Sequence, residues 1–160
     1  MDFYGINVLD DMTAEGAPDI GTTESPFGDI YGNVIATWGD LAEKYRCTEE
    51  CEPGVVVSVS KRDDIDVEPC SIDLCPTVIG VVSTAPGYKM NNQLESGKFI
   101  GLTGLIPVKI TGPVNKGDII VPTIDGCGRA GKLIELPYKI GVANETILDN
   151  GIHLVNCIIK

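Results

Sequence analysis

The chain has little positive charge and almost no histidine. Its 160 residues include 12 Lys and Arg against 23 Asp and Glu, which gives a formal net charge of -11, and only one His. The longest basic run, Lys61-Arg62, is followed at once by Asp63-Asp64. Such a surface repels phosphate backbones and anionic lipid headgroups. We therefore expect no nucleic-acid partner and no membrane partner.

The sequence also has no long apolar run. No segment reaches the about 18 apolar residues needed to cross a bilayer. The start, Met1–Tyr4, lacks the basic residues and the apolar core of a signal peptide, so we expect synthesis in the cytoplasm. Glycine and proline are abundant, with 19 and 10 residues, beside a hydrophobic share of 43%. This composition favours short strands and tight turns, so we predict an all-β fold, a compact β-barrel or β-sandwich.

Six cysteines are the least usual part of the composition. Cys47 and Cys51 are separated by three residues and Cys70 and Cys75 by four, while Cys127 and Cys157 stand alone. Two close pairs of thiolates are candidate zinc ligands, although the spacing is wider than that of a zinc knuckle. Disulfides near the first two strands are a second alternative, and free thiols are the simplest one. We predict no metal and no cofactor, with Cys47, Cys51, Cys70 and Cys75 as the zinc or disulfide candidates.

No residue pattern predicts catalysis. His153 lies in the alternating stretch 151–160, which is typical of a closing strand, and a catalytic cysteine would need such a base. Ser83 with Lys89 or Lys109 has the residue types of a Ser–Lys dyad for self-cleavage. Closeness in sequence, however, supplies neither a positioned base nor an oxyanion hole. We predict a protein that is not an enzyme.

Two further clusters have simpler structural explanations. Asp63, Asp64, Asp66 and Glu68 crowd one segment but lack the glycine turn and the distal glutamate of a calcium loop. We therefore favour a solvated loop over a Ca²⁺ site. The spaced glycines of 126–131 come between strands, with no helix whose N-terminus could bind phosphate, so they predict a hairpin connection.

Residues 1–36 show neither a helical nor an alternating period. They are rich in Gly, Asp, Thr and Pro, yet they contain spaced large apolar residues, of which disordered tails have few. We predict an extended N-terminal arm that becomes ordered on a neighbouring subunit. Its candidate contact residues are Phe3, Tyr4, Ile6, Val8, Leu9, Phe27, Ile30 and Tyr31.

Residues 37–160 predict a β domain. Only Thr37–Tyr45 has a helical pattern, and this pattern is short. Eight short strands rich in β-branched residues follow, most of them next to Gly or Pro. They are predicted at 55–60, 77–83, 99–103, 105–110, 118–122, 132–136, 139–143 and 151–160.

A weak internal repeat runs through this domain. Pro53-Gly54 before three valines matches Lys116-Gly117 before Asp-Ile-Ile-Val, and Ile79-Gly80-Val81 matches Ile140-Gly141-Val142. The matching glycines are 63 and 61 residues apart. The repeat predicts two similar β layers that pack on each other, with glycines at points of close backbone approach.

Several blocks, in order, resemble a known family. They are Trp38–Tyr45, Glu52–Val57, Val78–Asn91, Gly101–Ile110 and Gly112–Pro122. The most specific are Gly-Val-Val-Ser-Thr-x-Pro-Gly-Tyr and Gly-Pro-Val-x-Lys-Gly-Asp. Together they resemble a β domain of bacteriophage tail fibre and virion appendage proteins, often found upstream of a peptidase G2-type chaperone domain. The likeness covers about three quarters of the chain.

The resemblance implies a structural protein of the virion, commonly a trimer, without a cofactor. We therefore expect a fibre, appendage or capsid decoration subunit, made in the host cytoplasm and located in the virion. It would associate with itself as a homotrimer and bind other virion proteins through the arm. The alternative is an appendage module that binds a host-surface ligand through loops such as 61–76 or 88–98.

Overall fold

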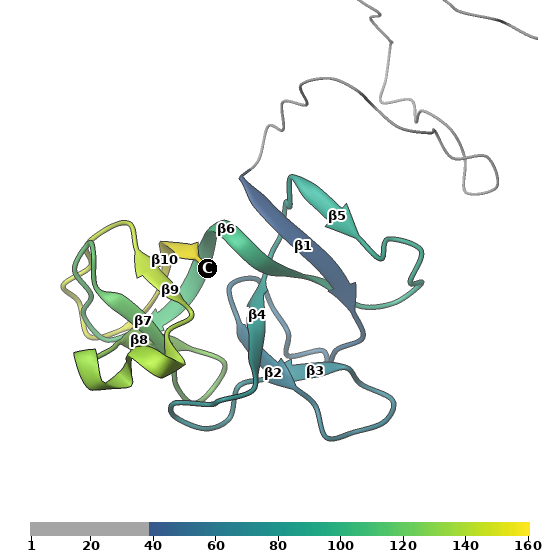
Figure 1. The fold of residues 1–160 in the computed structure, drawn as a ribbon, viewed down its shortest axis with the longest axis horizontal. Helices are drawn as coiled ribbons and strands as arrows, with labels where there is room; N and C mark the ends of the chain where they lie inside the picture. Colours follow the sequence, from purple (N-terminus) through teal and green to yellow (C-terminus); the bar gives the residue numbers. More distant parts are fainter. Residues whose placement is uncertain (1–38) are drawn as a thin grey trace, which may run out of the picture. The chain divides into compact units, whose positions relative to one another are not determined.

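Residues 39–160 are described by a computed structural model, in which they form ten strands and one short 3-10 helix (Figure 1). The strands are β1 (Asp40–Tyr45), β2 (Val56–Val59), β3 (Val67–Pro69), β4 (Val78–Val82), β5 (Tyr88–Met90), β6 (Lys98–Thr111), β7 (Ile119–Pro122), β8 (Gly128–Ala130), β9 (Gly141–Ala143) and β10 (Ile152–Ile159). The 3-10 helix is η1 (Leu133–Tyr138). The predicted all-β fold is confirmed. No helix in this part of the chain is long and apolar enough to cross a membrane.

The 14-residue strand β6 organises the sheet. Its first half pairs with β1 and β4, and its second half pairs with β10 and β8. Because β10 also pairs with β9, β9 with β7 and β7 with β8, these strands close a ring with β6. The fold is therefore a β-barrel, and β1 to β5 are additional strands beside it (Figure 1).

Two apolar clusters fill the fold. The barrel holds the larger one, built from inward residues that alternate along its strands, among them Ile106, Val108, Ile110, Ile120 and Val155. The smaller one lies among β2, β3, β4 and the first half of β6, and includes Val57, Val67, Val82 and Ile100. Alternation of this kind is what a sheet needs when one face covers a core.

The internal repeat of the sequence is a repeat of strand pairing. The order β3–β2–β4–β6 in one part of the sheet recurs as β8–β7–β9–β10 in the other. Val57 pairs with Gly80 in the first unit, and Ile120 pairs with Gly141 in the second. Both units belong to one continuous sheet, and buried residues of both, among them Val56 and Ile120, share one core cluster.

The turns that open the two units also match. Gly54 and Gly117 both have a left-handed backbone, with φ of 83° and 96°, a conformation that favours glycine. The N–H of Gly54 donates to the carbonyl of Val82, and the N–H of Gly117 donates to the carbonyl of Ala143, each at 2.9 Å. The same hydrogen bond thus fixes the start of each unit.

Two element predictions are wrong. The helical pattern at Thr37–Tyr45 is strand β1 from Asp40 onward, because pairing with β5 and β6 outweighs the weak preference of so short a segment for helix. The strand predicted at 132–136 is part of η1. There the Glu135 carboxylate accepts the N–H of Lys132 at 2.8 Å and closes a helical turn.

Other differences concern boundaries. The strands predicted at 99–103 and 105–110 are one strand, β6. The hairpin connection predicted at 126–131 contains β8, and the loops 61–76 and 88–98 contain β3 and β5. The domain boundary predicted at residue 37 lies just outside the described residues.

Candidate association surface

The outer side of the β6–β10 pair is apolar. Leu105 on β6 lies opposite Ile158 on β10, and Pro107 follows on the same side of β6. Ile152 and Leu154 continue the row along β10. All five side chains are exposed, Leu105 to 48% and Ile152 to 61%. We call Leu105, Pro107, Ile152, Leu154 and Ile158 the apolar face.

The sequence of β10 explains why this face exists. Val155, Cys157 and Ile159 point into the barrel and are buried. The outward positions between and before them would be polar on a sheet that faces water, yet Asn156 is the only polar one from residue 154 to 158. Several exposed apolar side chains on one side of a sheet, here beside the polar Asn156 and Lys109, are typical of a surface that binds another protein.

A cavity of about 360 Å³ adjoins this face. Its lining includes Leu105 and Pro107 of the apolar face, together with Gly39, Asp40 and Ser83. Asp40 is buried, and its carboxylate accepts the Ser83 hydroxyl at 2.6 Å. The cavity thus lies where the described part of the chain begins.

The Ser–Lys dyad considered from the sequence is not formed. The Ser83 hydroxyl donates to Asp40, whereas Lys109 forms an ion pair with Glu52 at 2.9 Å. The ammonium group of Lys89 lies 5.6 Å from the centre of the Phe99 ring. Neither lysine is therefore in place to act as a base for this hydroxyl.

The single histidine belongs to strand β10, as predicted. His153 pairs across the sheet with Ile110, and its Nε2 lies 2.7 Å from the Asp149 carboxylate at the edge of the fold. The contact with Asp149 lowers the pKa of that carboxyl group below its ordinary value. No cysteine takes part in this pair, which has the geometry of a local turn contact.

The acidic segment considered for Ca²⁺ is engaged with arginines. Asp64 pairs with Arg62 at 2.8 Å, and Asp66 pairs with Arg46 at 2.6 Å. Hydrogen bonds from these arginines lower the pKa of both carboxyl groups. Within residues 39–160, no group of three or more His, Cys, Asp or Glu side chains is placed to hold a metal ion.

All six cysteines are free thiols, and five of them are buried. Burial, with the neighbouring Cys51, raises the pKa of Cys47 to about 11. Burial also raises the pKa of Cys70 and of Cys157 to about 12. Because the thiolate is both the zinc ligand and the nucleophile, these three groups are weak candidates for either role at neutral pH.

A second exposed apolar group lies on η1. Leu133 and Ile134 are exposed to 84% and 86%. The next residue, Glu135, accepts two hydrogen bonds from Arg129 at 3.0 Å, and Arg129 also pairs with Asp73 at 2.8 Å. The hydrogen bonds from Arg129 lower the pKa of Glu135 to about 2. The helical turn is therefore held firmly while its two aliphatic side chains face solvent.

Sequence reasoning identified the strands of the apolar face but missed the face itself. The sequence of 152–158 contains a sign of this face. Three of its four outward residues, Ile152, Leu154 and Ile158, are apolar, although outward positions on a solvated strand are usually polar. The predicted arm residues Phe3, Tyr4, Ile6, Val8, Leu9, Phe27, Ile30 and Tyr31 lie outside the described residues, so the arm remains a prediction.

No protein-family model matches the chain, and no curated protein matches it in sequence. Solved structures do share its fold. Pre-mature bacteriophage phi29 gene product 12 aligns with a TM-score of 0.57 and 14% identity, over 80% of this chain and 23% of that chain. The C-terminal fragment of the same gene product aligns with a TM-score of 0.56 and 15% identity, over 76% of this chain and 100% of the fragment.

A third structure, the N base of head fibre gp8.5 of bacteriophage phi29, aligns more loosely, with a TM-score of 0.42 and 16% identity over 75% of this chain and 93% of that chain. The chain spans less than a quarter of the full gene product 12 and all of its C-terminal fragment. The fold likeness to a bacteriophage β domain, expected from the sequence blocks, is confirmed. The chain thus has the fold of the C-terminal fragment of a bacteriophage phi29 protein.

Proposed function

We propose that the chain is a non-enzymatic structural subunit of a bacteriophage virion, part of a fibre, an appendage or a capsid decoration. In this proposal, copies of the chain associate in threes through the apolar face, and residues 1–36 attach each copy to a neighbouring virion subunit. Its fold likeness to phage proteins supports the virion role.

The apolar face is the observation that carries self-association. Its residues lie on two long, fully paired strands whose other side packs into the barrel core. A surface on such strands needs no rearrangement before binding, so little ordering entropy opposes association. Apolar contact on both partners is typical of permanent assemblies.

The thiols of Cys70 and Cys157 favour a role without catalysis, whereas burial of Cys75 is outweighed by hydrogen bonds, first with Thr77, that lower its pKa. Ser83 donates to the Asp40 carboxylate, and neither Lys89 nor Lys109 is placed to act as its base. Burial of Cys70 and Cys157 raises their pKa values and keeps their thiols protonated. Because the thiolate is the reactive form, the raised pKa values make both thiols weak nucleophiles.

Purified virions of the phage that encodes the chain provide the test. Cryo-electron microscopy should show the β domain as an ordered multimer, with residues 1–36 on an adjacent subunit. Deletion of residues 1–36 should abolish incorporation while circular dichroism of the isolated protein stays unchanged. Normal incorporation of the truncated chain would contradict the arm, and absence of the protein from virions would contradict the virion role.

Host-surface binding is a second candidate, favoured by the exposed loops. Tyr88 is exposed to 63% on β5, and the segment 61–76 presents an exposed ion pair between Arg62 and Asp64. If these loops bind a host ligand, replacing their exposed residues 61–64 or 91–93 with Gly and Ser, which leaves β3 and β5 in place, should reduce phage adsorption at least tenfold. Unchanged adsorption would eliminate this candidate.

A further inference from the structure

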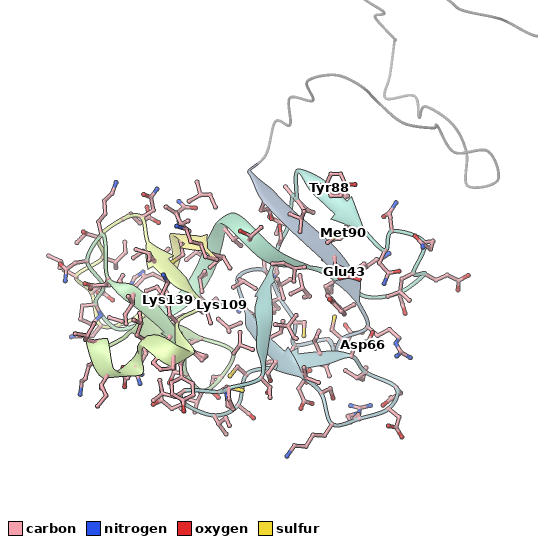
Figure 2. All side chains as sticks on the ribbon, viewed as in Figure 1. Glu43, Asp66, Tyr88, Met90, Lys109 and Lys139 are labelled. Atoms are coloured by element: carbon pink, nitrogen blue, oxygen red, sulfur yellow. The ribbon has the colours of Figure 1, made fainter. Side chains whose placement is uncertain are left out.

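Two lysines flank one aromatic ring on the strands beside the barrel. Lys44 on β1 lies opposite Phe99 on β6, and Lys89 on β5 lies opposite Ala42 on β1. Their ammonium groups are 5.8 and 5.6 Å from the centre of the Phe99 ring. We call Lys44, Lys89 and Phe99 the lysine cluster. Figure 2 labels Tyr88 and Met90, the neighbours of Lys89 along β5.

The positive charge of the lysine cluster is not neutralised within the described residues. Neither Lys44 nor Lys89 forms an ion pair there, whereas Arg46, Lys109 and Arg129 each do. Lys44 donates to the carbonyl of Leu94 at 2.6 Å, and an ammonium group has three donors, so donors remain. Two unpaired ammonium groups around a half-exposed ring match a ligand that carries both carboxylates and aromatic groups.

The N-terminal segment of the chain has this chemistry. Residues 1–36 contain seven of the 23 Asp and Glu residues and none of the 12 Lys and Arg residues. Acidic residues stand directly beside large apolar ones in Asp2-Phe3-Tyr4 and Asp29-Ile30-Tyr31. The segment is therefore an acidic, aromatic peptide, opposite in charge to the lysine cluster.

The segment is connected to the domain near the lysine cluster. It joins the described domain at Gly39, immediately before β1, and Lys44 lies on the same strand. At about 3.3 Å per residue, this is a distance of roughly 17 Å along β1. The start of the segment and the lysine cluster therefore belong to the same strand of the domain.

We propose that the lysine cluster of one subunit binds the acidic residues 1–36 of a neighbouring copy. The carboxylates of the segment accept hydrogen bonds from Lys44 and Lys89, and its aromatic side chains pack beside Phe99. This proposal rests on the proposed function, in which residues 1–36 are an arm, and it assigns the surface that the arm binds.

A charge exchange in the full-length chain tests the proposal. One variant is K44E/K89E, and a second has lysine at all seven acidic positions of residues 1–36. The self-association constant of each is measured by sedimentation velocity in 50 mM salt, where charge interactions are weakly screened. Each variant alone should associate at least tenfold more weakly than the wild type. In an equimolar mixture, opposite charges meet wherever unlike variants are neighbours, at two of the three contacts of a closed trimer, so the association constant should rise at least threefold above that of either variant alone.

Matched controls distinguish an effect of charge at the lysine cluster from an effect of net charge and from a loss of folding. K61E/K116E makes the same charge change at two exposed lysines elsewhere and should alter the constant less than threefold. K44Q/K89Q removes the charge without reversing it and should give an intermediate loss. Circular dichroism of each variant should match the wild type.

The outcomes distinguish the two proposals. If deletion of residues 1–36 weakens association tenfold but K44E/K89E does not, the lysine cluster is not the surface that the arm binds. The proposal that residues 1–36 form an arm would still hold. If neither change alters self-association, residues 1–36 do not bind a copy of the same chain, and incorporation into virions then decides whether they bind another virion subunit. A mixture that stays weak contradicts binding between copies. Polyphosphate binding that is lost in K44E/K89E, with association unchanged, would instead assign the cluster to an external anionic polymer.

Discussion

Gly80 and Gly141 occupy equivalent places in the two strand units, each against a backbone carbonyl. A Cβ at Gly80 would overlap the carbonyl oxygen of Gly101, and one at Gly141 would lie 2.6 Å from the carbonyl oxygen of Ile158. Neither neighbour can move without breaking strand pairing. Both positions therefore require glycine for the same physical reason, which is the closeness of a backbone carbonyl oxygen.

Replacing either glycine with alanine should destabilise the fold. We expect G80A and G141A each to lower the free energy of unfolding by about 1–3 kcal/mol, because overpacked cores cost this much. Urea denaturation followed by circular dichroism measures the change. The control is G39A, where an added Cβ would have no neighbour within 4 Å and the cost should stay below about 0.5 kcal/mol. Equal effects of G80A and G39A would contradict the close approach.

The hydrogen bonds between Arg129 and Glu135 predict how the stability of the fold depends on pH. They lower the pKa of Glu135 in the folded state from 4.5 to about 2. A lowered carboxyl pKa adds stability that is fully present above the unfolded value and is lost as pH falls through the folded value. Between about pH 4.5 and pH 2, the wild type should therefore lose more stability than E135Q. Parallel losses in both proteins would show that the pair with Arg129 has no effect.

Residue-scale features differ in how far sequence reveals them. The mid-strand glycines stand out in a β-branched strand, so close backbone approach at Gly80 and Gly141 was predictable and is confirmed. The contact of Arg129 with Asp73 joins positions 56 residues apart. Nothing local in the sequence marks such a pair.

Strand β6 shows how one element serves both a core and a surface. Ile106 is 1% exposed inside the barrel, and its neighbour Leu105 is 48% exposed on the apolar face. I106A should lower the free energy of unfolding by about 2–5 kcal/mol, because it leaves a cavity. L105A should change it by less than about 1 kcal/mol. Chemical denaturation of the monomer at low concentration measures both, and a reversed order would contradict the assigned strand faces.

Element predictions succeeded where the strands are long or strongly β-branched. β2, β4, β7 and β10 are found close to their predicted ranges. The three-residue strands β3, β5 and β8 were missed, whereas the equally short β9 lies within the predicted strand 139–143, whose Ile, Gly and Val pattern matches β4. β1 was taken for a helix because its strand partners are distant in sequence.

At the scale of the whole molecule, the repeat links sequence to architecture. The glycines at 54, 80, 117 and 141 predicted two related units, and the recurring strand order confirms them. Sequence alone did not show that the second unit closes into a barrel with β6, since closure depends on the β6–β10 pairing. The apolar face is a product of that same pairing. The candidate surface could therefore be found only after the strands were placed.

Sedimentation velocity of the full-length chain and of L105T/I158T at micromolar concentration tests self-association through the apolar face most directly. Threonine keeps the β preference of both strands and removes apolar area from the centre of the face. The account predicts a trimer for the wild type and a folded monomer, or association at least tenfold weaker, for the variant. A wild-type protein that stays monomeric, or a variant that associates as strongly as the wild type, would contradict it.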